Sequence, residues 1–98
     1  MDPRARAIEL AKLLGPERAD NYPSWINVGQ CLRGIDAGLL PAWIAFSRQS
    51  SKYTHHRECQ SLWDVMRPDP QSFGITSLHY WAKQDYPLAY AILAEGAC

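Results

Sequence analysis

One stretch of the chain, FSRQSSKYTHHRE, concentrates cationic, hydroxyl and aromatic side chains. All of it except the final Glu58 lies in a longer segment, from Ala37 to Arg57, that contains no carboxylate. Phosphate binding needs cationic and small hydroxyl donors, and an aromatic ring beside them can stack on a base. The predicted residues for contact with nucleic acid or nucleotide phosphate are Arg48, Ser50, Ser51, Lys52, Tyr53 and Arg57, with Ser47 as a further hydroxyl.

The same stretch has a second interpretation as an ordinary polar connection between two helices. Runs of charge are usually solvated surfaces, and Tyr53 could simply cover the edge of the core. A helix that begins just after the stretch would add positive potential from its N-terminus, which favours the phosphate interpretation. Composition alone leaves both alternatives open.

A metal site is the other chemistry that the residue types suggest. His55 or His56 could share a helical face with Cys59, and Cys31 could join them from another helix. The competing interpretation places both thiols in the core and the adjacent histidines in solvent. The three cysteines, Cys98 included, show no CxxC spacing, so we expect reduced thiols, no bound metal and no cofactor.

Catalytic signatures are absent from the sequence. There is no GxxxxGK[ST] phosphate loop, no GxSxG elbow and no HExxH zinc motif. We therefore expect that this domain is not an enzyme by itself.

Charge and hydropathy limit the classes of partner. Ten basic residues balance ten acidic ones, so any attraction to nucleic acid must be local. No apolar run approaches the roughly 20 residues that a membrane helix needs, and the first residues lack the pattern of a signal peptide. These features predict an intracellular protein without a membrane partner.

Apolar residues recur at helical spacing along most of the chain, which predicts an all-α, single domain over residues 1–98 with about five to six short helices. No segment alternates as a strand does. The first helix is expected over Pro3–Leu14, with Asp2 as its cap, followed by a polar connection through Ala19 and Asn21. The other helices are expected from Ser24 to Gly34, Leu39 to Ser47, Cys59 to Met66, Thr76 or Ser77 to Ala82, and Leu88 to Glu95.

The four tryptophans could be stacking platforms for bases, but each falls in the apolar stripe of a predicted helix. Core packing is therefore the stronger interpretation. The predicted structural core consists of Trp25, Val28, Gly29, Leu32, Trp43, Trp63, Leu78 and Trp81.

Four blocks of sequence also occur in a characteristic order: YPSWINVGQCLRGI, LLPAWIAFSRQSSKY, ECQSLWDVM and GITSLHYWAKQDYP. Together they resemble the primase C-terminal domain family of the second type, most strongly over residues 21–90. Members follow the primase core in primase-helicases of large DNA viruses, the poxvirus type being the most similar, and in some phage and plasmid replication proteins. The resemblance implies a helical module, excised here from a larger primase-helicase, that lies between the primase core and a superfamily-three helicase.

Two hypotheses follow from the resemblance. The first is a non-catalytic accessory domain for viral DNA replication that binds single-stranded template or nucleotide phosphates through the residues from Arg48 to Arg57. The second is a structural adaptor that docks the primase core on the helicase without contacting nucleic acid. An exposed apolar patch around Leu39-Leu40 or from Tyr86 to Tyr90 would favour the adaptor.

Overall fold

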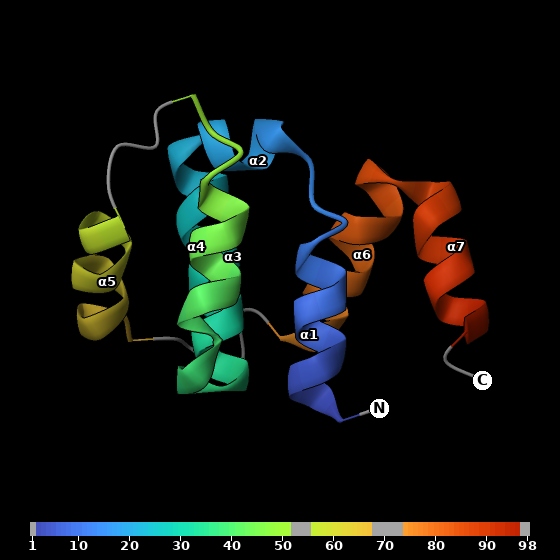
Figure 1. The fold of residues 1–98 in the computed structure, drawn as a ribbon, viewed down its shortest axis with the longest axis horizontal. Coiled ribbons are helices and arrows are strands. Elements are labelled where there is room, and N and C mark those ends of the chain that lie inside the picture. Colours follow the sequence, from blue (N-terminus) through green and yellow to red (C-terminus); the bar gives the residue numbers. More distant parts are fainter. Residues whose placement is uncertain (1, 52–55, 68–73, 97–98) are drawn as a thin grey trace.

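The computed structural model describes residues 2–51, 56–67 and 74–96, and every regular element in these ranges is helical (Figure 1). The expected all-α fold is therefore confirmed. The elements are α1 (Pro3–Ala11), α2 (Pro16–Asp20), α3 (Tyr22–Ile35), a 3₁₀ turn η1 (Ala37–Leu39), α4 (Leu40–Ser47), α5 (His56–Val65), α6 (Ile75–Asp85) and α7 (Pro87–Gly96).

Helix α1 starts as expected and ends earlier than expected. Its N-cap is Asp2, whose Oδ1 accepts hydrogen bonds from the backbone N–H groups of Arg4 (2.9 Å) and Ala5 (3.1 Å). At the other end, the N–H of Leu14 donates to the carbonyl three residues back, at Ala11, over 3.2 Å. The chain therefore tightens into a turn that buries Leu14, and the predicted extension of the helix to that residue is wrong.

The polar connection expected before the second helix is instead a short helix, α2. Pro16 occupies its first turn, where the missing N–H costs nothing. Helix α3 then begins at Tyr22, because the side chain of Asn21 accepts a hydrogen bond from the N–H of Ser24 (3.1 Å) and so acts as the N-cap. Ser24, the expected cap, lies inside the helix.

Helix α4 begins at Leu40, one residue after its expected start. Helix α5 begins at His56 and carries Arg57 on its exposed side, as expected. Helix α6 begins at Ile75 after Gly74, earlier than expected. Thr76 and Ser77, the expected caps of α6, are helical, since Gly74 already sits at the cap position in extended backbone. Helix α7 begins at Pro87 in the predicted region.

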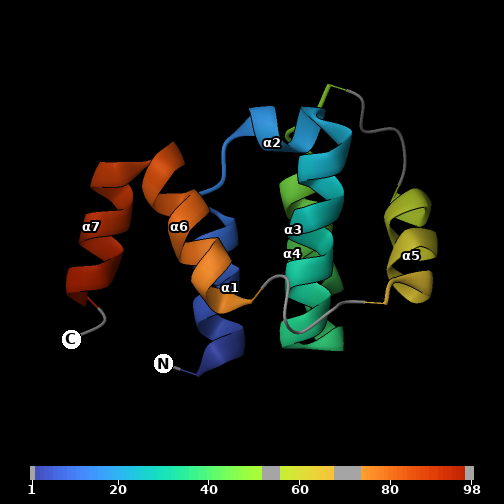
Figure 2. The same cartoon turned by 180° about the vertical axis from the view of Figure 1, so that it is seen from behind.

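Helices α3 and α4 lie side by side at the centre of the molecule (Figures 1 and 2). Helix α5 packs on one flank of this pair, while α1 and α6 pack on the other, and α7 lies outermost against α6. Helix α2 crosses one end of the central pair. The single globule measures 37 × 27 × 20 Å.

Three tryptophans form a continuous row through the core. The ring of Trp43, which is fully buried, stacks on Trp25 with 4.9 Å between ring centroids and lies 5.8 Å from Trp63. The indole N–H of Trp43 donates to the carbonyl of Trp25, and that of Trp63 donates to the carbonyl of Ala37. The indole N–H groups of Trp43 and Trp63 therefore both have hydrogen-bond acceptors, as buried polar groups in a core require.

The predicted core set is arranged around this row. Val28, Gly29, Leu32, Trp43, Trp63 and Leu78 are buried, while Trp25 and Trp81 are half-buried and pack against the others. Gly29 allows the closest approach between α3 and α4. A Cβ atom at this position would lie 2.7 Å from Cε2 of Trp43 and 2.7 Å from Cε of Met66.

Candidate nucleic-acid interface

The turn that follows α4 carries the described part of the predicted phosphate-binding stretch. Arg48 is the C-cap of α4 and its side chain is exposed, as is Ser51 three residues later. Arg57 is exposed in the first turn of α5. Ser50 is half-buried in the same turn. Lys52 and Tyr53, the remaining members of the predicted set, lie outside the described residues.

A carboxylate from another helix enters this turn. Oδ1 of Asp20, the last residue of α2, accepts hydrogen bonds from the hydroxyl of Ser50 (2.7 Å) and from the backbone N–H of Ser51 (3.1 Å). The absence of carboxylates along the sequence from Ala37 to Arg57 therefore does not hold in space. Asp20 was missed because it lies 30 residues away in the sequence from Ser50.

Ser47 is not available to a ligand, in contrast to the prediction that counted its hydroxyl among the phosphate donors. Only 2% of its surface is exposed. Its Oγ donates to the carbonyl of Trp43 and accepts from the indole N–H of Trp25, both over 2.7 Å. Ser47 thus joins the core of α4 to the tryptophan row.

Gln49 fixes the start of the turn. Its side-chain amide donates to the carbonyl of Leu14 (3.1 Å) and to that of Phe46 (3.2 Å). Leu14 lies in the turn after α1, and Phe46 lies in the last turn of α4. The turn after α4 is therefore held by Gln49 to the segment after α1 and by Asp20 to α2.

Both described cysteines among the predicted metal ligands are buried. Cys31 is fully buried and its thiol donates to the carbonyl of Gly74 (3.0 Å). Burial raises the pKa of Cys31 to about 12 and also raises the pKa of Cys59. No group of three or more metal-ligating side chains occurs within residues 2–51, 56–67 and 74–96; His55 and the side chain of His56 lie outside the described part.

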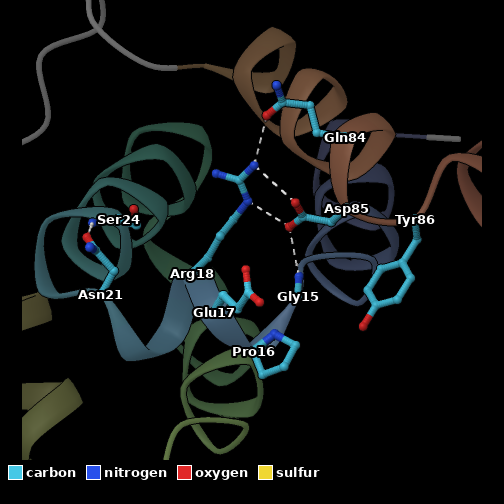
Figure 3. Close-up of a pocket in the computed structure, with 9 residues that line it drawn as sticks. All are labelled: Gly15, Pro16, Glu17, Arg18, Asn21, Ser24, Gln84, Asp85 and Tyr86. Carbon is cyan, nitrogen blue, oxygen red and sulfur yellow. Dashed lines mark hydrogen bonds and ion pairs between the residues drawn. The ribbon is translucent and has the colours of Figure 1, made fainter.

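A polar pocket of about 520 Å³ lies between α2 and the junction of α6 and α7 (Figure 3). One wall is an ion pair: the guanidinium of Arg18 contacts both carboxylate oxygens of Asp85 at 2.6 and 3.1 Å. The same carboxylate accepts from the N–H of Gly15 (2.8 Å). Arg18 also lies over the ring of Trp81.

This ion pair joins segments 67 residues apart, so no local pattern in the sequence predicted it. Both side chains are about four-fifths buried, with 20% of Arg18 and 18% of Asp85 exposed. We interpret the arrangement as a structural tie between the start of the chain and α6.

Helix α7 presents large apolar side chains to solvent. Leu88 is 81% exposed and Ile92, one helical turn later, is 71% exposed. Tyr86 before the helix is 44% exposed. The other predicted location for an apolar patch is excluded, because Leu39 is only 1% exposed and packs in the core.

The inner side of α7 is anchored by a polar contact. Nδ1 of His79 on α6 lies 2.9 Å from the hydroxyl of Tyr90. Burial, with a smaller contribution from the nearby Arg6 charge, lowers the pKa of His79. The contact turns Tyr90 inward, so the exposed side of α7 is the one with Leu88 and Ile92.

Comparison with known proteins identifies the class of domain. The family model for primase C terminal 2 (PriCT-2) matches residues 7–82, which include all the helices from most of α1 to most of α6. The chain therefore belongs to this family, as its sequence blocks indicated.

Its relatives include viral proteins that are named putative helicases and putative primases. A protein of Acanthamoeba polyphaga mimivirus named "Putative helicase" is 39% identical over 86% of this chain. A protein of Invertebrate iridescent virus 6 with the same description is 36% identical over 89% of the chain, and a "Putative primase" of African swine fever virus is 29% identical over 96%. The chain spans only 9 to 10% of the length of these relatives.

No solved structure matches the chain significantly. Among the described helices, none has the length and apolar character needed to cross a membrane.

Proposed function

We propose that this domain is a non-catalytic accessory module of a larger viral primase-helicase, and that it contacts single-stranded template or nucleotide phosphates through the turn after α4. Family membership and the viral relatives support the replication role. The observation that carries the contact itself is the exposure of Arg48 and Ser51 in this turn and of Arg57 in the first turn of α5. Lys52 and Tyr53 complete the proposed set.

In this proposal the domain positions a substrate and performs no chemistry. Arg48 and Arg57 supply charge, and Ser50 and Ser51 supply short hydroxyl and amide donors to phosphate oxygens. A single-stranded ligand held by about three phosphate contacts loses affinity with salt at a slope of about −0.7 per contact in a log–log plot. Tethering to the rest of the parent protein would raise the effective concentration and offset weak intrinsic binding.

The first experiment is a fluorescence-anisotropy titration of a labelled oligodeoxythymidine at low and moderate salt. Replacing three cations at once (Arg48→Ala, Lys52→Ala, Arg57→Ala) is expected to weaken binding by about tenfold or more at low salt and to flatten the salt dependence. The matched control removes three cations elsewhere (Lys12→Ala, Arg67→Ala, Lys83→Ala), each of which has an exposed side chain. Equal losses in the two triple variants would exclude a specific site, and absence of binding by the folded wild type at low salt would refute the proposal.

A second candidate function is the adaptor, and the exposed face of α7 favours it. Two large aliphatic side chains one turn apart, Leu88 and Ile92, have little contact with their own domain. Such faces commonly mark protein interfaces. In this candidate, α7 docks on the primase core or on the superfamily-three helicase of the same parent protein, inside the host cytoplasm or nucleus.

The adaptor predicts a specific loss. The double change Leu88→Ser, Ile92→Ser should leave the thermal midpoint within about 2 °C, because both side chains are exposed. In analytical ultracentrifugation, the wild-type domain is expected to co-sediment with the separately produced remainder of its parent protein. The double variant is expected to sediment separately from it. If the double variant still co-sediments with the remainder of the parent protein, α7 is not the docking surface.

A further inference from the structure

The carboxylate of Asp20 accepts two hydrogen bonds from the turn after α4. One carboxylate oxygen, Oδ1, receives both the Ser50 hydroxyl at 2.7 Å and the Ser51 backbone N–H at 3.1 Å. Two short donors that converge on a single anionic oxygen form the arrangement that also binds a phosphate oxygen. The exposed cation Arg48 precedes these donors by two and three residues along the same turn.

We infer that Asp20 is an internal competitor for phosphate: its carboxylate occupies the donors that a backbone phosphate of the single strand takes in the complex. The inference rests on the proposed function and names the atoms that act in it. Binding exchanges one anion for another at the Ser50 hydroxyl and the Ser51 amide. No covalent bond changes, and the released carboxylate returns to solvent.

Competition with phosphate would explain why residue 20 is a charged Asp, since a purely structural contact does not need the negative charge. A neutral acceptor such as Asn could hold the Ser50 hydroxyl and the Ser51 N–H in the same geometry, through weaker hydrogen bonds. A carboxylate adds a negative charge beside the segment from Ala37 to Arg57, whose own sequence has none. That charge opposes a phosphate on the same turn, so it makes occupancy depend on how strongly the ligand is held elsewhere.

The decisive variant is Asp20→Asn, which removes the charge and keeps an acceptor oxygen. Labelled oligodeoxythymidine at low salt is expected to bind this variant about three- to tenfold more tightly than the wild type. The matched control is Glu17→Gln, which removes an exposed carboxylate three residues earlier on the same short helix, away from the Ser50 and Ser51 contacts. It is expected to change affinity less than Asp20→Asn does, because the Ser50 hydroxyl and the Ser51 N–H donate to Asp20 and not to Glu17.

A second measurement uses the wild-type domain, so that the inference can be tested even if the Asp20→Asn variant folds poorly. Addition of oligodeoxythymidine to the ¹⁵N-labelled domain should shift the amide resonance of Ser51, whose hydrogen-bond acceptor changes. The amide of Ser24 should stay in place, because its acceptor is the side chain of Asn21 (3.1 Å) and is not part of the turn.

The outcomes separate the inference from the proposed function. Tighter binding by Asp20→Asn than by the wild type, without equal tightening by Glu17→Gln and with a shift at Ser51 in the wild type, supports the competitor. Binding by the wild type that Asp20→Asn leaves unchanged or weakens overturns the competitor and leaves the proposed function standing, as does equal tightening by Glu17→Gln. If neither the wild type nor Asp20→Asn binds at low salt, both are overturned.

Discussion

Replacement of Gly29 by Ala is expected to destabilise the domain, although Ala is the better helix former. The new methyl group would lie 2.7 to 2.8 Å from two carbon atoms of the Trp43 ring and 2.7 Å from Cε of Met66. Met66 is flexible and can move, but Trp43 is fully buried and stacked on Trp25, so α3 and α4 must separate. Overpacking of this kind costs about 1 to 3 kcal/mol, which exceeds the helix-propensity gain of about 1 kcal/mol.

Urea unfolding monitored by tryptophan fluorescence measures this effect directly. Gly29→Val should cost more than Gly29→Ala, because its branched side chain adds volume at the same contact. Gly34→Ala on the same helix is the control, since Gly34 is exposed and its substitution should be neutral or slightly stabilising. A Gly29→Ala domain as stable as the wild type would show that the helices are not packed at the distance described.

Asp85→Ala is expected to lower the free energy of unfolding by about 2 kcal/mol, since charge-assisted hydrogen bonds contribute about 1.5 to 3 kcal/mol and this pair is partly exposed. The change removes three hydrogen bonds at once, two from Arg18 and one from the N–H of Gly15. It also leaves the guanidinium of Arg18, four-fifths buried, without its carboxylate. The remaining partners of Arg18 are Gln84 and the face of Trp81.

A double-mutant cycle with Arg18→Met isolates the pair. The double variant should be more stable than the sum of the two single effects predicts, because it contains no unpaired buried charge. The exposed pair of Glu9 and Lys12 is the control: Glu9→Ala should change the unfolding free energy by less than about 0.5 kcal/mol. Additive effects in the Arg18 and Asp85 cycle would mean that the tie contributes little.

Helix α2 supplies both Arg18, which pairs with Asp85, and Asp20, which bonds to the turn after α4. A helix of five residues has no stability of its own in water, so tertiary contacts must hold it. Arg18 ties it to α6, and Asp20 ties it to the turn after α4. Loss of the Arg18 and Asp85 pair should therefore also loosen the hold of Asp20 on Ser50 and Ser51, which connects the stability of the domain to the proposed phosphate site.

The sequence by itself determined the helical class, the approximate place of the longer helices and the family. Apolar spacing is a local signal, and the residues that gave it at Leu10, Val28, Leu32, Trp43 and Leu78 are all buried in the structure. Helix starts were less accurate, because the choice of cap depends on competition between neighbours. Asn21 was not recognised as the cap of α3, and Gly74 precedes α6 without any side-chain cap.

Only the tertiary structure decided what surrounds the candidate site. It brought Asp20 to Ser50 across 30 residues and Asp85 to Arg18 across 67, and it buried Ser47, which looked like one more exposed hydroxyl. It also left Leu88 and Ile92 in solvent although their spacing is typical of a buried face. The physical reason is the same in each case: a local pattern reports which residues share a face of one helix, whereas the partner of that face depends on how the helices pack.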